Sequence, residues 1–430
     1  MIVRELIEKI EGEAELDFTF NEGKIEDVRI SFAFYRGIEE ILVGKDARDA
    51  LVITPRVCGI CNHAHLIAAV KTIENGYENA GLKVELSNKA KAIREFTLSC
   101  ELMQNHMTWF YMTILPQLEK LLGEASGENH ALKASYFSST ITKAMSIFAG
   151  QWPHSSYAVP GGVTCDPTYV DVMQAENLVD ESIRFYEEMV IGMPIDKYLE
   201  IDSNAFLYDL DGDLARVLQL IGMNEMADIG QSHDRFIAFG DSTLFKAGKS
   251  MKTRVYSVDA NYVEESVQQG TVAKAVTYKH KLYEVGPLAR AMVSKEPMVK
   301  RLHKCYKDSI LTRVFARVHE VALLLSHSKE LLQNLRLDEP SCSLGKELIV
   351  PDFEGVGAVE AARGSLIHKT TVKEGLIENY EIIVPTQWNL SHGDDRENGI
   401  AIEAMVGSSS TEEATFIFRT FDVCSVCTAQ

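Results

Sequence analysis

The placement of four of its eight cysteines constrains this chain of 430 residues more than any other feature. They stand in two Cys-x-x-Cys pairs, Cys58/Cys61 near the start and Cys424/Cys427 close to the end. Almost the whole chain separates the two pairs. If the pairs share one site, segments from both ends of the chain must meet at its centre.

Two such pairs are also the usual ligand set of a structural zinc ion. A zinc ribbon normally carries its second pair some tens of residues after the first, whereas Cys427 here stands three residues before the end, where a chain frays unless something holds it. Polar residues able to bond the sulfurs also surround the first pair, from Arg56 to His65. These details count against zinc, which remains a competing interpretation. The scattered cysteines are expected to be buried, reduced thiols: Cys100, Cys165, Cys305 and Cys342.

The hydrophobic pattern predicts an α+β fold that is mainly α. Helical spacing of apolar residues covers three regions, and alternation around a turn predicts a hairpin near the start. The expected helices are 88–122 (interrupted only by Pro116), 169–189, and a group over 285–335 with Leu323, Leu324 and Leu325 in its core; the hairpin is 13–32, short strands and loops fill 199–281, and strands and turns fill 348–407. We expect a central bundle of long helices with β segments at both chain ends, and both termini meeting at a buried metal site.

No internal repeat divides the chain, so one domain over 1–430 is expected. It would comprise an N-terminal hairpin with the first metal motif (1–66), long helices (67–200), a mixed insert (201–290), further helices (291–347), and a β/turn segment with the second metal motif (348–430).

The charge balance limits the classes of partner. The chain has 62 acidic and 43 basic side chains and a net charge of −19, which argues against nucleic acid or anionic lipid as the main partner. No signal peptide is visible and no apolar run is long enough to span a bilayer. The expected location is the cytoplasm, with membrane association or export only through a partner.

The motifs around the cysteine pairs resemble the paired signature of [NiFe]-hydrogenase large subunits. Arg-x-Cys-Gly-x-Cys-x-x-x-His runs from Arg56 to His65, and Asp-x-Cys-x-x-Cys runs from Asp422 to Cys427. Further blocks occur in the family's order and span essentially the whole chain: Lys9-Ile10-Glu11-Gly12, Arg36-Gly37-Ile38-Glu39, the segment from Trp152 to Val163, Glu360-Ala361-Ala362-Arg363-Gly364, and Val384-Pro385-Thr386-Gln387-Trp388-Asn389.

The resemblance implies reversible heterolytic cleavage of H2 at a buried Ni–Fe(CN)2(CO) centre. All four thiolates would hold the nickel, with Cys58 and Cys424 terminal and Cys61 and Cys427 bridging to the iron. Soft thiolates favour such redox-capable metals over hard ions.

The catalytic groups implied are Cys424, Glu11 and Arg363. Cys424 would accept the proton first, and Glu11 would take it from the thiolate as a general base. Arg363 would bring a permanent positive charge over the open site. Asp422 is the expected partner of that arginine.

Two further residues would bond the centre from outside the ligand set. His65 would donate a hydrogen bond to a bridging sulfur, Cys427 by analogy. Thr386 would donate one to a cyanide on the iron.

A magnesium ion is also implied by the resemblance. Its ligands would be the Glu39 carboxylate, a main-chain carbonyl assigned to Ile382, and the C-terminal residue. Glu40 competes with Glu39 for the first of these roles. The C-terminal residue, a histidine in the family, is Gln430 here, and its amide oxygen can still serve a hard metal.

The sequence departs from the family pattern at four other positions without losing a nickel ligand. Ala362 and Val423 stand where the family has prolines, Glu13 replaces a histidine, and Asn105 replaces an aspartate. A carboxylate partner for Arg363 is therefore expected from Asp422. The chain stops where the family's maturation protease would cut, which indicates either a processed form or a gene without an extension.

The partners and the competing functions follow from the cysteine count. The chain has no second cysteine set for an electron-transfer cluster, so electrons would leave through an iron–sulfur small subunit in a heterodimer or a higher oligomer. One alternative is a hydrogen-sensing subunit with the same metal site. Another is a relative of the quinone-module subunit of respiratory complex I, which lacks the nickel cysteines and so fits poorly.

Overall fold

A computed structural model describes residues 1–10, 12–32, 35–124, 126–203, 210–251, 254–267, 274–344, 350–394 and 396–424. The side chains of residues 8–10 and 12 are left aside as well. Three residues with expected roles lie outside this part of the chain: Glu11, Cys427 and Gln430.

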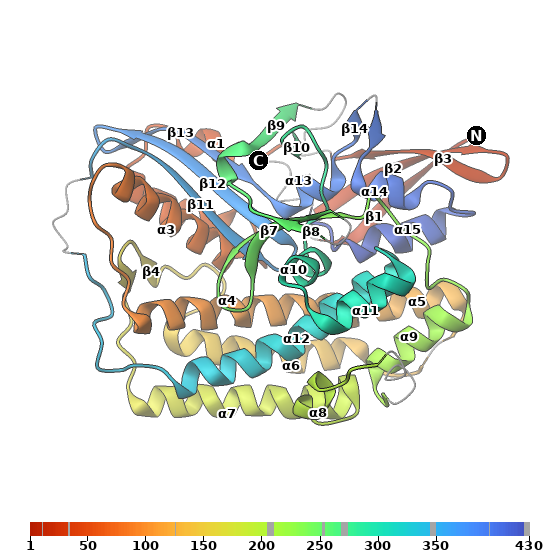
Figure 1. Ribbon diagram of the computed structural model, residues 1–430, viewed down its shortest axis with the longest axis horizontal. Coiled ribbons are helices and arrows are strands. Elements are labelled where there is room, and N and C mark those ends of the chain that lie inside the picture. The colour runs from red at the N-terminus through yellow and green to blue at the C-terminus, as the bar shows by residue number, and fades with distance from the viewer. Residues whose placement is uncertain are drawn as a thin grey trace.

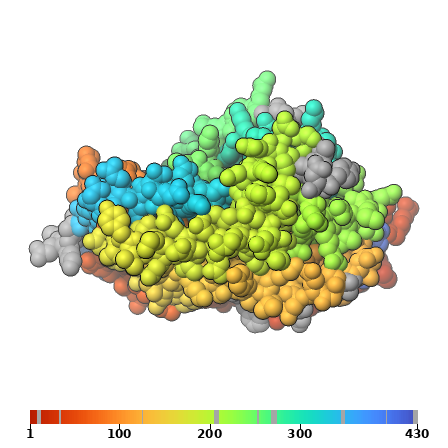
Figure 2. Space-filling model, turned by 90° about the horizontal axis from the view of Figure 1, so that it is seen from below, coloured from red at the N-terminus to blue at the C-terminus, as the bar shows by residue number. Residues whose placement is uncertain are grey.

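Four long helices form a bundle along one side of the molecule (Figure 1). They are α4 (Asn88–Trp109), α6 (His130–Ala149), α7 (Tyr169–Phe185) and α12 (Ile310–Gln333). Helices α4 and α7 both pack against α6 and α12, which closes the bundle. Seen from the helical side, the end of α12 lies in cyan beside the yellow surface of the region around α7 (Figure 2).

Each bundle helix starts at a polar residue whose side chain accepts a hydrogen bond from a first-turn N–H. These caps satisfy backbone donors that have no partner inside the helix. They are Ser87, Asn129, Thr168 and Ser309, and Thr168 forms a full capping box with Asp171.

The predicted long helices are confirmed. Helix α4 continues through a π-helical turn into α5 (Leu115–Leu122), where Pro116 stands in the first turn and is tolerated. The region 169–189 is α7 followed by a π-helical turn that ends at Ile191. The region 285–335 contains α10 (Pro287–Ser294), α11 (Pro297–Tyr306) and α12. One core assignment is wrong: Leu324 and Leu325 are buried, but Leu323 is only partly buried and lines a cavity between α10 and α12.

The expected N-terminal hairpin is β2 (Gly12–Asn21) and β3 (Lys24–Ser31), paired antiparallel. Glu22 and Gly23 both have positive φ, as a two-residue turn with the twist of a hairpin requires. An unexpected third strand, β1 (Ile2–Ile10), pairs with β2.

A second three-stranded antiparallel sheet consists of β11 (Phe353–Ala361), β12 (Gly364–Lys373) and β13 (Leu376–Ile383). The insert carries the sheet β6–β7–β8 and the hairpin β9–β10. Their bounds are β6 (Arg235–Asp241), β7 (Lys246–Met251), β8 (Arg254–Tyr256), β9 (Val263–Val267) and β10 (Lys274–Tyr278); two-residue ladders are β4 (Ala158–Val159) with β5 (Gly162–Val163) and β14 (Gly393–Asp394) with β15 (Glu397–Asn398).

Further helices connect these layers, and several of them lie where only strands and loops were expected. The helices of the connecting and C-terminal regions are α1 (Ile38–Leu42), α2 (Ala50–Ile53), α3 (Asn62–Asn79), α8 (Ile195–Leu199), α9 (Asp213–Met223), α13 (Pro385–Leu390), α14 (Ile400–Met405) and α15 (Thr411–Thr420). The mainly helical α+β class is confirmed. Among the described residues, no helix combines the length and apolarity needed to cross a bilayer.

Strand β11 lies directly against α3, and glycine makes this approach feasible. A Cβ atom on Gly357 would lie 2.4 Å from the Ala68 carbonyl oxygen and 2.5 Å from the Thr72 nitrogen. From the other side, a Cβ on Gly76 would overlap the Phe353 ring. At Gly357 the backbones of α3 and β11 therefore meet without a side chain between them, and β12 also packs against α3.

We predict that Gly357→Ala destabilises the protein, because the new methyl group must push α3 and β11 apart. Overpacking of this kind costs about 1–3 kcal/mol or more. The free energy of unfolding from urea denaturation measures it. Gly222→Ala in α9 is the control, since a Cβ there meets nothing within 4 Å. Equal stability of the two variants would contradict this description of the α3–β11 contact.

Candidate metal centre

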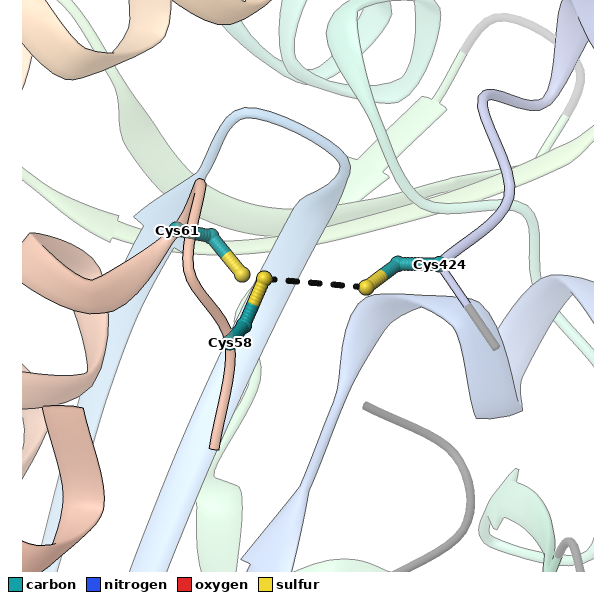
Figure 3. A group of neighbouring side chains, drawn as sticks. All are labelled: Cys58, Cys61 and Cys424. Atoms are coloured by element: carbon teal, nitrogen blue, oxygen red, sulfur yellow. Dashed lines mark hydrogen bonds between the residues drawn. The ribbon is translucent and has the colours of Figure 1, made fainter. Parts of the chain in front are cut away.

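Three cysteine sulfurs from opposite ends of the chain gather at one buried point (Figure 3). Cys58 lies in the loop before α3, Cys61 immediately precedes α3, and Cys424 follows α15. The Sγ atoms of Cys58 and Cys424 are 3.7 Å apart, and all three sulfurs lie within 4.8 Å of one another. None of the three side chains is more than 7% exposed and none forms a disulfide. The described part of the chain thus brings together three of the four thiols expected to share a site.

Arg363 supplies the positive charge that buried thiolates require. It stands in the turn between β11 and β12 and lines one small cavity together with His65, Thr386 and two of the cysteines. Burial opposes the charge on the guanidinium, but Asp422 and the three thiols raise its pKa well above the usual arginine value.

The expected pairing of Arg363 with Asp422 is confirmed. Its Nε donates to the Asp422 carbonyl oxygen at 2.8 Å, and its Nη2 donates to Oδ1 at 3.2 Å. Asn105 accepts from Nη1 at 3.2 Å, so the amide takes part where the family has an aspartate. The other oxygen of Asp422 is bonded by Arg317 of α12, a second cation that the sequence motifs did not reveal.

Thr386 lies at the start of α13, beside Cys424. Its hydroxyl oxygen accepts a hydrogen bond from the Cys424 backbone N–H at 3.3 Å. The hydroxyl hydrogen is not used in that bond. The expected contact of Thr386 with the site therefore has a geometric basis, through the residue that carries the thiol.

His65 belongs to a row of buried side chains that reaches away from the thiols. Its Nδ1 lies 3.1 Å from His368 Nε2, and His368 Nδ1 lies 2.9 Å from the Tyr380 hydroxyl. Burial lowers the pKa of His65 to about 4 and that of His368 well below its usual value. Both imidazoles are therefore neutral at physiological pH. Neither His368 nor Tyr380 was singled out from the sequence.

Two other residues fix the cysteine loop without any signal in the metal motif. Both carboxylate oxygens of Glu101 accept backbone N–H bonds at the start of α3, from His63 at 2.8 Å and Ala64 at 3.0 Å. Burial raises the pKa of Glu101 to about 8. Arg36 donates to the carbonyl oxygen of Val57, next to Cys58, at 2.5 Å. In the sequence, the only sign of this role was that Glu101 is a charged residue within the apolar stretch of α4.

Comparisons with known proteins agree with this geometry. The family model described as "Nickel-dependent hydrogenase" matches residues 36–115 and 211–429. The chain belongs to the nickel-dependent hydrogenase family.

Similar proteins match this hydrogenase over nearly its full length. The periplasmic [NiFeSe] hydrogenase large subunit of Desulfomicrobium baculatum is 26% identical, over 93% of this chain and 88% of its own. The quinone-reactive Ni/Fe-hydrogenase large chain of Wolinella succinogenes is 24% identical, over 99% of this chain and 94% of its own. The solved structure of the Ni-Fe-Se hydrogenase from D. vulgaris Hildenborough has the same fold, with a TM-score of 0.85, 23% identity and full coverage of both chains. The chain is thus an oxidoreductase of the hydrogenase class.

The described residues around Glu39 do not fit the magnesium ion that the resemblance implied. Its Oε1 accepts from the backbone N–H of Ile382 at 2.7 Å, so Ile382 meets it through a donor and not through its carbonyl. Its Oε2 accepts from the Lys274 ammonium at 2.8 Å. Glu40 instead bonds the Tyr35 hydroxyl. Magnesium requires oxygen ligands in octahedral geometry, whereas N–H donors point at this carboxylate.

The four scattered cysteines differ in burial, which corrects the expectation that all are buried. Cys100 is buried, Cys165 is partly buried, and Cys305 and Cys342 are exposed. The last two stand near the end of α11 and in an irregular segment, where periodicity does not fix the facing of a side chain.

We predict that Cys424→Ser abolishes stable nickel incorporation and that Cys100→Ser leaves nickel content unchanged. The first thiol lies in the cluster, and the second is a buried thiol of α4 whose pKa is raised by burial, so it stays protonated and binds no metal. Nickel, iron and zinc are measured by mass spectrometry in both variants. Equal nickel loss in the two, or stoichiometric zinc in the unmodified protein, would contradict the ligand assignment.

Proposed function

We propose that this hydrogenase cleaves H2 reversibly and heterolytically at a nickel–iron centre held by Cys58, Cys61, Cys424 and Cys427. The observation that carries the proposal is the group of three buried thiols beside a buried arginine. Cys427 follows Cys424 at the spacing that Cys61 keeps from Cys58. When bound, a centre of nickel and an iron with two cyanides and one carbon monoxide supplies the redox chemistry for breaking the H–H bond.

The donor set suits such a centre. Thiolates favour soft, redox-capable metals, and burial keeps water from competing for them. Zinc would also accept thiolates, but it has no redox chemistry. Cys58 and Cys424 would serve nickel alone, and Cys61 and Cys427 would also serve the iron.

The proton released from H2 needs an acceptor at the site. We assign the first acceptance to the sulfur of Cys424 and the next to the carboxylate of Glu11. The role of Glu11 rests on its Ile-Glu-Gly block, because this residue lies outside the described part of the chain.

Arg363 holds a fixed positive charge beside the thiolates. Its bonds to Asp422 and Asn105 orient the guanidinium before substrate arrives, so it needs no reorganisation during the reaction. Thr386 is proposed to donate its hydroxyl hydrogen to a cyanide.

The row of His65, His368 and Tyr380 determines which nitrogen of His65 carries its proton. The Tyr380 hydroxyl can donate to His368 Nδ1, and His368 Nε2–H then donates to His65 Nδ1. His65 keeps its own proton on Nε2, where it is available to a thiolate, Cys427 by analogy. If the hydrogen bonds of the row ran in the opposite direction, His65 would carry its proton on Nδ1. Its unprotonated Nε2 would then face negative sulfurs, which is unfavourable.

The electrons require a route out of the chain. Its remaining cysteines are scattered, and the D. baculatum relative is named a large subunit. We therefore propose that the partner is an iron–sulfur small subunit, bound in a heterodimer or a higher oligomer. A cytoplasmic location, with any membrane association through the partner, remains our expectation.

Hydrogen–deuterium exchange between D2 and water tests the proposal. The unmodified holoenzyme should catalyse exchange, and Arg363→Lys should lower the rate by about 10²–10³-fold, as expected for loss of one preorganised donor group. A lysine keeps the charge but cannot make the three bonds of the guanidinium.

Arg301→Lys provides the matched control, because Arg301 donates to the Ile201 carbonyl oxygen and does not line the cavity of the cysteines. Its exchange rate should stay near that of the unmodified enzyme. Absence of exchange in a nickel-loaded holoenzyme would refute the proposed function, and equal rates in both variants would refute the role of Arg363.

A further inference from the structure

The hairpin β9–β10 places a lysine between two carboxylates, one on α1 and one on β9. Lys274 begins β10, and its Nζ donates to Glu39 Oε2 at 2.8 Å and to Glu265 Oε2 of β9 at 3.2 Å. The carboxylates are about one-eighth exposed (13% and 12%), and the lysine side chain is 29% exposed. Glu39 therefore has a cation from its own chain.

The ammonium keeps its charge in this setting. Burial alone would lower the pKa of Lys274, but Glu265 and Glu39 outweigh that effect and raise it above the usual lysine value. Burial also raises the pKa of Glu265 to about 7. A divalent ion bound to the same carboxylates would stand close to this ammonium and repel it.

We propose that the Lys274 ammonium is the resident cation at Glu39 and that this hydrogenase binds no divalent ion there. The lysine holds these elements in place as a metal ion would. The Glu39 carboxylate of α1 accepts from Lys274 of β10 and from the Ile382 N–H of β13, so three elements meet at one carboxylate. Lys274 is a positioning residue and does not touch the reacting atoms.

Two further contacts connect the Glu39–Lys274 pair to the thiols. Ile382 pairs with His368 across β13 and β12, and the His368 ring bonds His65. His65 lines the same cavity as Cys61 and Cys424. The cation at Glu39 thus supports β13, which carries Tyr380 and pairs with the strand that carries His368.

Metal content gives the first test. The purified holoenzyme is dialysed against EDTA, and magnesium, nickel and iron are measured in the same sample. The proposal expects magnesium far below one per chain and an unchanged melting temperature. Stoichiometric magnesium, or a melting temperature that falls with EDTA and recovers with magnesium, would overturn it.

The variant Lys274→Met gives the second test, because it removes the charge and keeps the length of the side chain. The buried Glu39 carboxylate then lacks its cation, and the apparent melting temperature should fall by a few degrees. Added Mg²⁺ should recover most of that loss, since the two carboxylates can then accept a metal ion. The unmodified protein should show no such response.

Lys133→Met is the matched control. Lys133 also bridges two carboxylates, Glu128 at 2.5 Å and Asp213 at 2.8 Å, and its side chain is 20% exposed. Mg²⁺ should not recover this variant, because the Glu128 side chain is 47% exposed and stays hydrated without a cation. The proposal fails if Lys274→Met melts as the unmodified protein does, if Mg²⁺ leaves it unchanged, or if Mg²⁺ raises both variants equally. Neither readout depends on H2 cleavage, so this proposal and the proposed function can fail separately.

Discussion

The burial of several thiols at one point is the constraint on which the rest of the structure depends. Thiolates in a dry interior repel one another and lose their hydration, so charge and hydrogen-bond donors must be built around them. Arg363 meets the charge requirement, and Asp422 with Asn105 holds it in place. Because the thiols come from both ends of the chain, the fold must close upon this site before the arrangement is complete.

The same constraint explains why the bundle next to the site is not purely apolar. On α12, Arg313, Arg317 and Glu320 follow one another at helical spacing and are all buried. Arg317 bonds Asp422, and Glu320 bonds Arg290 of α10 at 2.6 and 2.9 Å. Although burial alone would raise it, Arg290 and His106 hold the pKa of Glu320 down to about 2. Removing one partner of such a pair costs about 3–5 kcal/mol, so this stripe fixes the position of α12.

How much could be predicted from the sequence depends on the range of the interaction. The spacing of Cys58, Cys61 and Cys424, together with the block around Arg363, indicated the family. Helical periodicity located α4, α7 and α12 but not α6. The β1 strand and the short C-terminal helices have weaker patterns, and tertiary packing decides them.

Residues whose partners are distant in the sequence could not be recognised from the sequence around them. Lys274 lies 235 positions from Glu39, and His368 lies 303 positions from His65. Each resembles an ordinary polar residue of a strand until the fold brings its partner beside it. The same holds for Arg317, which in sequence resembles a surface charge on an amphipathic helix. One sequence contains no record of such contacts, so only the structure could reveal them.

The central claim is that these thiols hold an iron with cyanide and carbon monoxide beside nickel, and infrared spectroscopy of the purified holoenzyme tests it most directly. Triple-bonded diatomic ligands on a metal absorb in a spectral window where the polypeptide does not. We expect both cyanide and carbon monoxide bands in the unmodified protein and their loss in Cys424→Ser. A nickel-containing, correctly folded protein without any of these bands would contradict the claim.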